Sequence, residues 1–499
     1  MSKSLGMRRL FFDTIVDRDW CLIEGFQKDA WLALGWASRF ACDKVSLIFS
    51  GKKMKTAWPR FLLVGITLAC ACNSAMASET LMDFLKETTF SGNVRAYDFN
   101  RIYSHDTQDA QPSQSAFSIG GRFDLHSGTF LGGFSVGAGF LTAHSLGLND
   151  RDGNLIHLDR TLAGSNNSLT ALGQAYVQFK NDWVSVKAGD QNINTPWLSD
   201  SDSRLLPATY QGVTVDATPI NHLHLIGLRI FRWKSRTSND YYQNNLYYAP
   251  TYDGDDLRGG TGTALATADT QGTLAFGSTY ADHGIKVGVW YYNFEQFANM
   301  VYNDTVYTLT TGSGFDPFIG DQFVRQWKSN SLLNDAAVNT VKGEGVDNLT
   351  YGAKAGLNSP YGQLMLSYTG ISNHPGAVGN GALISPYTIG YTTDPIDTSS
   401  MIRGVVDLGP GHAWKVRYTD KFLDEQVVVI AAFARYYSYA YGDSNNALID
   451  VAYYPKGFIK GFSIRNRAED AVVSTPSKGL NPGKSKIFIY DRVQLQYEF

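Results

Sequence analysis

Apolar and polar residues alternate along most of the chain beyond residue 80, and the alternation is clear in the last segment, IFIYDRVQLQYEF. The apolar positions of that segment share one parity: Ile487, Ile489, Val493, Leu495, Tyr497 and Phe499. The other parity is mainly polar and also holds two aromatic residues: Lys486, Phe488, Tyr490, Arg492, Gln494, Gln496 and Glu498. A period of two is typical of a β-strand with one apolar and one polar face. Asp491 lies on the apolar parity, which indicates either a bulge there or a position at a polar interface.

Alternating segments of similar length recur through the sequence, without a sustained helical period or a change of composition that would mark a second domain. They predict strands at 88–101, 115–127, 130–143, 168–180, 183–190, 208–218, 222–235, 271–282, 285–294, 348–357, 362–371, 399–408, 412–421, 426–437, 447–454, 458–468 and 485–499. A closed barrel with both chain ends on one side needs an even number of strands. Because Gly409-Pro410-Gly411 is either a turn or a break within one strand, sixteen and eighteen are the consistent totals.

The connections between the predicted strands alternate in length. Short turns are predicted at 126–128, 181–182, 218–221, 282–284, 358–362 and 455–457. Long polar connections separate them at 144–167, 191–207, 236–270, 295–347 and 372–398. Soluble β-proteins rarely contain connections this long, whereas outer-membrane barrels alternate short periplasmic turns with long external loops. The sequence therefore predicts an all-β fold, a transmembrane antiparallel β-barrel whose apolar parity contacts lipid.

The composition agrees with a membrane barrel. The chain contains 28 Tyr and 28 Phe, a supply that suits the aromatic girdles at both membrane interfaces. The predicted inner parity is polar, whereas a small soluble barrel would fill its interior with Val, Ile and Leu. No stretch reaches the ~20 apolar residues that a membrane-spanning helix needs.

Residues 54–77, MKTAWPRFLLVGITLACACNSAMA, have the features of a secretory signal peptide. Lys55 and Arg60 precede an apolar run that ends in Ala75-Met76-Ala77, and such a sequence is typical of a cleaved export signal. A buried core helix is the alternative interpretation, but the run ends without a helix cap. We therefore predict an upstream extension at 1–53 that is absent from the mature protein, a signal peptide at 54–77 and a barrel at 78–499.

The predicted processing narrows the chemistry of the mature chain. All four cysteines, Cys21, Cys42, Cys70 and Cys72, would be removed, which excludes a disulfide, a cysteine nucleophile and a cysteine-ligated metal. Acidic residues outnumber basic ones by 46 to 43 in the whole chain, and the removed segment is net basic. An acidic exported protein is a poor candidate for nucleic-acid binding. Since no nucleophile motif such as G-x-S-x-G is present, we predict no catalytic residue, no metal and no cofactor.

A row of cations lies in the last third of the chain, at positions that we assign to the inner parity. These residues are Arg403, Lys415, Arg417, Arg435, Arg465, Arg467 and Arg492. A cation facing lipid at the bilayer midplane costs ~2–4 kcal/mol, whereas a wet lumen hydrates it. Guanidinium groups offer a planar fork of donors to carboxylates, and several weak sites in series suit conduction. The alternative is that these cations pair with acidic residues and only fill the wall.

Three segments match a known pattern: DSRLLPATYQG at Asp202–Gly212, WKVRYTDKF at Trp414–Phe422, and AFARYYSYAYGD around Arg435. They resemble the OprD-like channels, the substrate-selective porins of the Gram-negative outer membrane, and the order of strands agrees through 80–499. In that family, the stretch similar to DSRLLPATYQG belongs to a third external loop that folds into the lumen. The resemblance implies eighteen strands and passage of small carboxylate-bearing nutrients, such as amino acids or aromatic acids. The extension at 1–53 departs from the family pattern.

The resemblance also implies a basic ladder along one side of the lumen, to which we assign the seven cations named above. It implies that Asp202, Ser203 and Arg204 lie in the constriction loop. The predicted partners are small anionic solutes, outer-membrane lipid and lipopolysaccharide, and the barrel-assembly machinery, which would recognise the C-terminal Phe499. Monomer and trimer both stay open. Two other functions also stay open, a general non-selective porin and an outer-membrane barrel hydrolase.

Overall fold

The computed structural model describes residues 84–103, 113–149, 157–164, 167–200, 204–243, 270–296, 298–328, 345–377, 380–383, 395–401, 410–438, 443–457, 459–474 and 485–499. The chain divides into two compact units, Met1–Met76 and Ala77–Phe499. All described residues belong to the second unit. The predicted extension at 1–53 and signal peptide at 54–77 lie outside the described residues.

Strands dominate the described part of the chain. They are β1 (Thr89–Tyr103), β2 (Gln114–His126), β3 (Phe134–His144), β4 (Ser168–Lys180), β5 (Val184–Gln191), β6 (Thr209–Ile220), β7 (Leu223–Lys234), β8 (Thr273–Asp282), β9 (Ile285–Phe294), β10 (Ala298–Thr308), β11 (Asp316–Lys328), β12 (Asp347–Ser359), β13 (Gly362–Ile371), β14 (Gly411–Phe422), β15 (Val427–Ser438), β16 (Ser444–Tyr453), β17 (Phe462–Ser474) and β18 (Ser485–Glu498). No helix among the described residues is long and apolar enough to cross a membrane.

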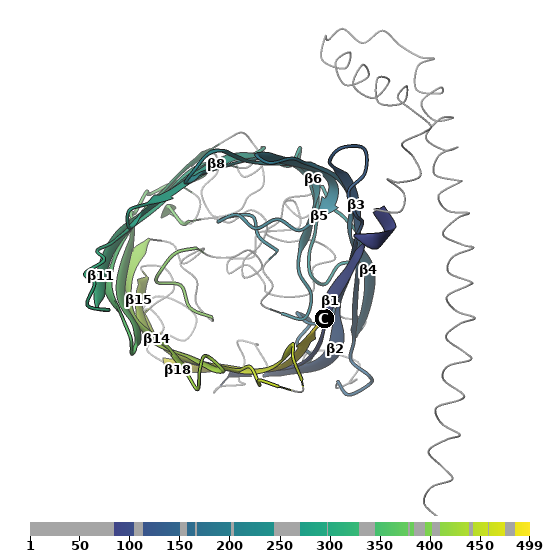
Figure 1. Ribbon diagram of the computed structural model, residues 1–499. Coiled ribbons are helices and arrows are strands. Elements are labelled where there is room, and N and C mark those ends of the chain that lie inside the picture. The colour runs from purple at the N-terminus through teal and green to yellow at the C-terminus, as the bar shows by residue number, and fades with distance from the viewer. Residues whose placement is uncertain are drawn as a thin grey trace, which may run out of the picture. The chain divides into compact units, whose positions relative to one another are not determined.

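The strands form one closed antiparallel ring, seen end-on in Figure 1. Each strand pairs with the next along the chain, and β18 pairs with β1 to close the ring, for example through Ala96 and Leu495. This closure leaves no free sheet edge, which a membrane barrel requires because lipid offers no hydrogen bonds. The described residues thus form the predicted barrel, and eighteen is the strand number.

The structure differs from the sequence prediction at two places. The predicted loop at 295–347 contains β10 and β11, joined by a short connection at 309–315. The pattern of β10 is hard to recognise because the inner side chains of its first half are apolar: Met300 and Tyr302 are buried inside the barrel. Of the strand predicted at 399–408, residues 399–401 lie in no strand and 402–408 lie outside the described residues; in the barrel, β13 pairs directly with β14.

The outer face of the barrel is apolar. Alternate side chains project outward and stay exposed, such as Ile319 at 63%, Phe276 at 55% and Tyr497 at 45%. A soluble monomer rarely exposes so many large apolar side chains, and a bilayer covers them. Asp491 belongs to this outer face, because the pairing of β18 with both neighbours runs past it without a bulge. Its carboxylate accepts a hydrogen bond from Asn466 Nδ2 at 2.9 Å.

Loop three, residues 192–208 between β5 and β6, enters the ring of strands; its described parts are 192–200 and 204–208. On one side of the lumen, the fully buried Trp197 packs edge-on against Tyr302 of β10, with ring centroids 5.8 Å apart. On the other side, Leu205 and Leu206 join a second apolar cluster at β1. Loop three therefore reaches both of these parts of the barrel wall.

Candidate functional site

Three predicted cations lie together on the inner face of β17 and β18. Arg467 is directly opposite Arg492, and Arg465 is opposite Gln494. Arg492 is only 3% exposed, whereas Leu495 on the other parity of β18 faces outward. The two adjacent strands therefore place three guanidinium groups on one section of the lumen wall.

The Arg492 guanidinium lies over two aromatic rings. Its central carbon is 4.8 Å from the centroid of Phe99 and 5.4 Å from that of Tyr490. Both rings stabilise the cation through cation–π attraction. Nε and Nη2 have no hydrogen-bond acceptor among the described residues. A buried donor without an acceptor is costly, so both groups can gain free energy by donating to a solute.

Loop three adds Arg204 to the same place. The Arg204 guanidinium lies 4.7 Å from the centroid of Phe99, and its Nε donates to Thr161 Oγ1 at 3.4 Å. Its backbone carbonyl accepts from Arg95 Nη1 at 3.1 Å. We call Arg95, Arg204, Arg465, Arg467 and Arg492 the arginine wall.

Carboxylates compensate this wall unevenly. Asp450 accepts from Arg465 at two atoms, Nε at 2.7 Å and Nη2 at 2.5 Å. The same carboxylate lies 4.0 Å from Arg467 Nε, which is the limit of an ion pair. Arg101, further along β1, pairs with Asp159 at 2.5 Å. Arg465 and Arg101 are thus neutralised, whereas Arg467 is only loosely paired.

Arg95 and Arg101 were not among the predicted site residues. Both are buried and share a parity with Tyr97 and Phe99. Alternation of arginine and aromatic residues in NVRAYDFNR was the available signal. It was missed because β1 becomes a neighbour of β18 only when the barrel closes.

The prediction for Arg435 is wrong, since this residue lies on the outer face of β15 with Phe433, which is 41% exposed. Its partners are Asn445 Oδ1 at 3.2 Å, Asp443 at 3.8 Å and the ring of Tyr437 at 4.7 Å. The parity was misassigned because the inner residues of this strand are small or apolar. They are covered by a polypeptide segment that the sequence pattern did not reveal.

That segment is the lumen strap, residues 395–401, which runs along the inner wall. Side chains of six strands hold it: Gln322 of β11, Lys354 of β12, Thr369 of β13, Lys415 of β14, Tyr436 of β15 and Glu469 of β17. Hydrogen bonds to the strap backbone include Tyr436 Oη to the Thr398 carbonyl at 2.6 Å and the Met401 amide to Glu469 at 2.7 Å. The strap is therefore fixed by polar contacts along its whole length.

The other predicted cations fall into three cases. Lys415 faces inward but is buried, and its Nζ donates to the Ser399 carbonyl of the strap at 2.6 Å. Arg417 also faces inward and is partly exposed, with Nη2 donating to Gln363 Oε1 at 3.2 Å. Arg403 lies outside the described residues, as do Asp202 and Ser203 of the predicted constriction loop.

A second charged group lies on β10 and β12 and was missed from the sequence. Lys354 Nζ is 2.9 Å from Asp304 and 3.0 Å from Asp397 of the strap. Burial raises the pKa of Asp397, and the neighbouring Lys354 ammonium opposes this rise. We call Asp304, Lys354 and Asp397 the balanced wall, because two carboxylates compensate the one buried cation.

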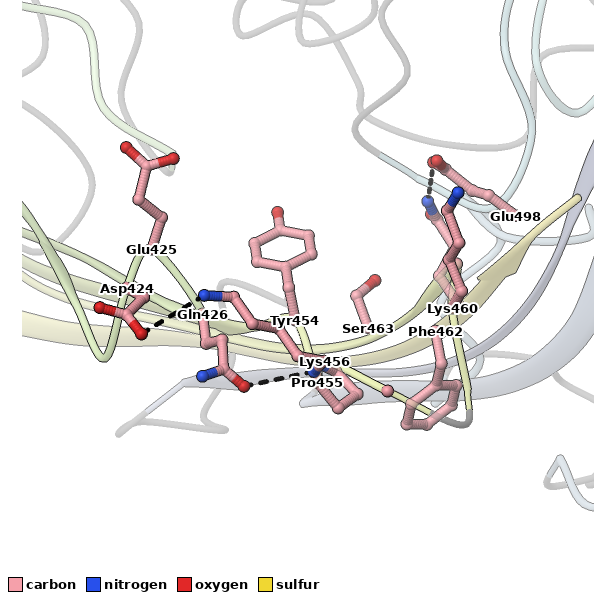
Figure 2. A pocket seen from close by; sticks show the side chains of 13 residues that line it. Asp424, Glu425, Gln426, Tyr454, Pro455, Lys456, Lys460, Phe462, Ser463 and Glu498 are labelled. Carbon is pink, nitrogen blue, oxygen red and sulfur yellow. Dashed lines mark hydrogen bonds and ion pairs between the residues drawn. The ribbon is translucent and has the colours of Figure 1, made fainter.

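A pocket of about 490 Å³ lies at the end of the barrel where the chain terminates. Figure 2 shows Asp424 and Gln426 reaching Lys456, whose Nζ is 3.6 Å from the Asp424 carboxylate. Lys421 pairs with Glu425 at 3.0 Å nearby. Acidic and basic side chains are thus mixed in this pocket, so the arginine wall is the stronger candidate for an anion site. Among the described residues, no group of three His, Cys, Asp or Glu side chains could hold a metal ion.

Comparison with known proteins identifies the family. The family model described as outer membrane porin, OprD family, matches residues 82–378. The chain belongs to this family. Members are porins, channels rather than enzymes, that are integral to the outer membrane, so the predicted family and location are confirmed. A search among curated proteins by sequence found no match.

Solved structures of OprD-family porins have the same fold. OccAB3 of Acinetobacter baumannii is 17% identical with a TM-score of 0.64, and the match covers 83% of this chain and 100% of OccAB3. OccK9 of Pseudomonas aeruginosa is 18% identical with a TM-score of 0.66, covering 83% and 99%. OpdK of P. aeruginosa, solved with vanillate, is 15% identical with a TM-score of 0.63, covering 83% and 99%. At these identities the likeness establishes the fold alone.

Proposed function

We propose that this porin passes small carboxylate-bearing solutes, such as amino acids and organic or aromatic acids, and that the arginine wall guides them through the lumen. The observation that carries the proposal is the state of Arg492. Its guanidinium is buried, lies on the aromatic ring of Phe99, and keeps two N–H groups without an acceptor among the described residues. A carboxylate oxygen is the acceptor that best matches a guanidinium fork.

The remaining cations suit transient binding rather than one tight site. Arg417 is partly exposed on the inner face of β14, and Arg467 keeps only a loose contact with Asp450. Several weak sites in series let a solute enter and leave, which conduction requires. In this proposal, Arg204 belongs to the constriction together with Asp202 and Ser203, and Arg403 extends the track. Lys415 acts indirectly, by holding the lumen strap.

One relative supports the class of solute to be tested. The OpdK structure was solved with vanillate, which is a small aromatic carboxylate. For the present chain, the alternative is a general porin that passes solutes by size alone. The two functions differ in whether carboxylates compete with the ionic current at concentrations where neutral sugars do not.

The test is single-channel recording of the refolded barrel in a planar bilayer, with benzoate or a neutral sugar added at equal concentration. We expect benzoate to block the current and the neutral sugar not to block it. Hydrogen bonds to charged groups contribute ~1.5–3 kcal/mol, so Arg492→Gln should weaken the block by about 10-fold to 100-fold. Arg435→Gln, on the outer face, is the matched control and should leave the block unchanged. Current that is indifferent to benzoate would instead support a general porin.

Targeting forms a separate part of the proposal. Residues 54–77 direct export and are removed together with 1–53, and Phe499 is recognised by the barrel-assembly machinery. N-terminal sequencing of the barrel purified from outer membranes should begin after Ala77. A sequence that starts upstream of Met54 would contradict this assignment.

A further inference from the structure

We propose that the cross-strand pair Arg467 and Arg492, together with Arg204 from loop three, is a binding site that prefers dicarboxylates to monocarboxylates. This inference rests on the proposed function and specifies the solute. Its basis is the charge of these three residues and the register that pairs Arg467 with Arg492.

The register places two like charges side by side. Arg467 and Arg492 are directly opposite on neighbouring antiparallel strands, and both project into the lumen. Directly opposed residues have Cβ atoms about 5 Å apart, and like charges in such a pair destabilise the sheet. An anion that bridges the two guanidinium groups converts this repulsion into two attractions.

The local acids do not remove the repulsion. Asp450 is the one carboxylate in contact with the pair among the described residues, and it is already held by two atoms of Arg465. The Arg467 guanidinium lies at the ion-pair limit of Asp450, 4.0 Å away. Arg492 has no ion pair within the described part of the chain; instead, the charges of Arg204 and Arg467 act on it. A monocarboxylate compensates one member of the pair Arg467 and Arg492, whereas a dicarboxylate compensates both.

The apolar surroundings of Arg492 strengthen the preference for dicarboxylates. Phe99 and Tyr490, which flank Arg492, are 0% and 7% exposed. Leu205 and Leu206 of loop three close the same apolar cluster. Charges interact more strongly in such a water-poor environment than in bulk solvent. The second carboxylate of a short dicarboxylate therefore adds a large part of the binding free energy, rather than the small part expected in an open aqueous pore.

The experiment compares succinate with butyrate, two four-carbon acids, as blockers of single-channel current at pH 7 and constant ionic strength. We expect succinate to bind at least about 10-fold more tightly, since the second carboxylate meets a second cation. Arg467→Gln should reduce the preference to about 2-fold or less, because succinate loses its second cation whereas butyrate still meets Arg492. Arg467→Lys retains the charge and should keep most of the preference.

A stability measurement accompanies the recordings. A ligand that binds only the folded state raises the unfolding temperature, so succinate should raise that of the wild-type barrel more than butyrate does. The difference should vanish in Arg467→Gln and persist in Arg435→Gln. Equal binding of the two acids by the wild type would overturn the dicarboxylate site but leave the proposed carboxylate channel intact. Block by neither acid would overturn both.

Discussion

The arginine wall and the balanced wall face the same lumen but differ in how far carboxylates compensate their cations. In the balanced wall, two carboxylates lie within about 3 Å of the Lys354 ammonium. In the arginine wall, Arg465 takes the Asp450 carboxylate and leaves Arg467 and Arg492 undercompensated. An inward-facing cation is therefore not by itself a solute site. In the proposed function, the compensation of its charge decides whether the cation holds the structure or binds an anion.

External loops produce this difference. The lumen strap brings Asp397 to the β12 cation Lys354, whereas loop three brings Arg204 to the β18 cation Arg492. One loop thus adds an acid to its wall and the other adds a base. Changes in the two loops should alter selectivity without altering the strands.

Detaching loop three should have the largest effect on the difference between the two walls. Trp197→Ala removes the ring that packs on Tyr302, and replacement of a fully buried Trp costs about 3–5 kcal/mol of loop docking. We expect higher single-channel conductance and weaker carboxylate block, because Arg204 is no longer held against Phe99. Conductance and block equal to those of the wild type would show that Trp197 does not anchor the loop.

Removing the cation of the balanced wall should have the next largest effect. Lys354→Met leaves Asp304 and Asp397 without their shared partner, so the reversal potential in a salt gradient should shift towards cation selectivity. Because Asp304 is partly open to the lumen, the loss of unfolding free energy should stay below the ~3–5 kcal/mol typical of a broken buried pair. Lys354→Arg keeps the charge and serves as the control. An unchanged reversal potential would mean that this wall does not act on permeating ions.

Acidification should leave the cations of the balanced wall undercompensated, as those of the arginine wall already are. Because burial raises the pKa of Asp397, the folded barrel binds this proton more tightly than the unfolded chain does. The group's contribution to stability is therefore complete at low pH and is lost as pH rises through the folded-state pKa. Between neutral pH and the ordinary value of ~3.9 for Asp, Asp397 becomes neutral before exposed carboxylates do.

Neutral Asp397 leaves the two nearby cations, Lys354 and Lys415, compensated by less negative charge, with Asp304 as the remaining acid on the balanced wall. Anion selectivity should consequently rise as pH falls, which the reversal potential measures at each pH. In Asp397→Asn, the part of this rise in anion selectivity that comes from protonation of residue 397 should be absent. An identical pH profile in the variant would assign the effect to other groups.

The smallest effect is expected at Arg435, an arginine on the outer face rather than in either wall. Its contact with Asp443 is 3.8 Å and partly exposed, so Arg435→Gln should change the free energy of unfolding by less than about 1 kcal/mol. Conductance and reversal potential should match the wild type. Loss of anion selectivity in this variant would place Arg435 on the solute path after all.

The sequence by itself determined the type of fold, the membrane-facing surface and the family. A period of two is a local property, because neighbouring side chains of a strand must point to opposite faces. It is strong wherever lipid lies outside and water inside, as in β18. The same alternation places Arg465, Arg467 and Arg492 on the inner face. The stretch DSRLLPATYQG, which contains Arg204, predicted loop three through its resemblance to the family and not through its periodicity.

Only the tertiary structure decided what the inner side chains contact. Met300 and Tyr302 are apolar yet face inward because loop three covers them, so the alternation failed at β10. The lumen strap covers inner residues of β15 that are apolar, and for this reason Arg435 was assigned to the wrong face. The strap also accepts a hydrogen bond from Lys415. Closure of β1 on β18 brought Phe99 beside Arg492, although the two residues lie near opposite ends of the chain. Periodicity reports which way a side chain points; it cannot report which distant segment folds back to meet it.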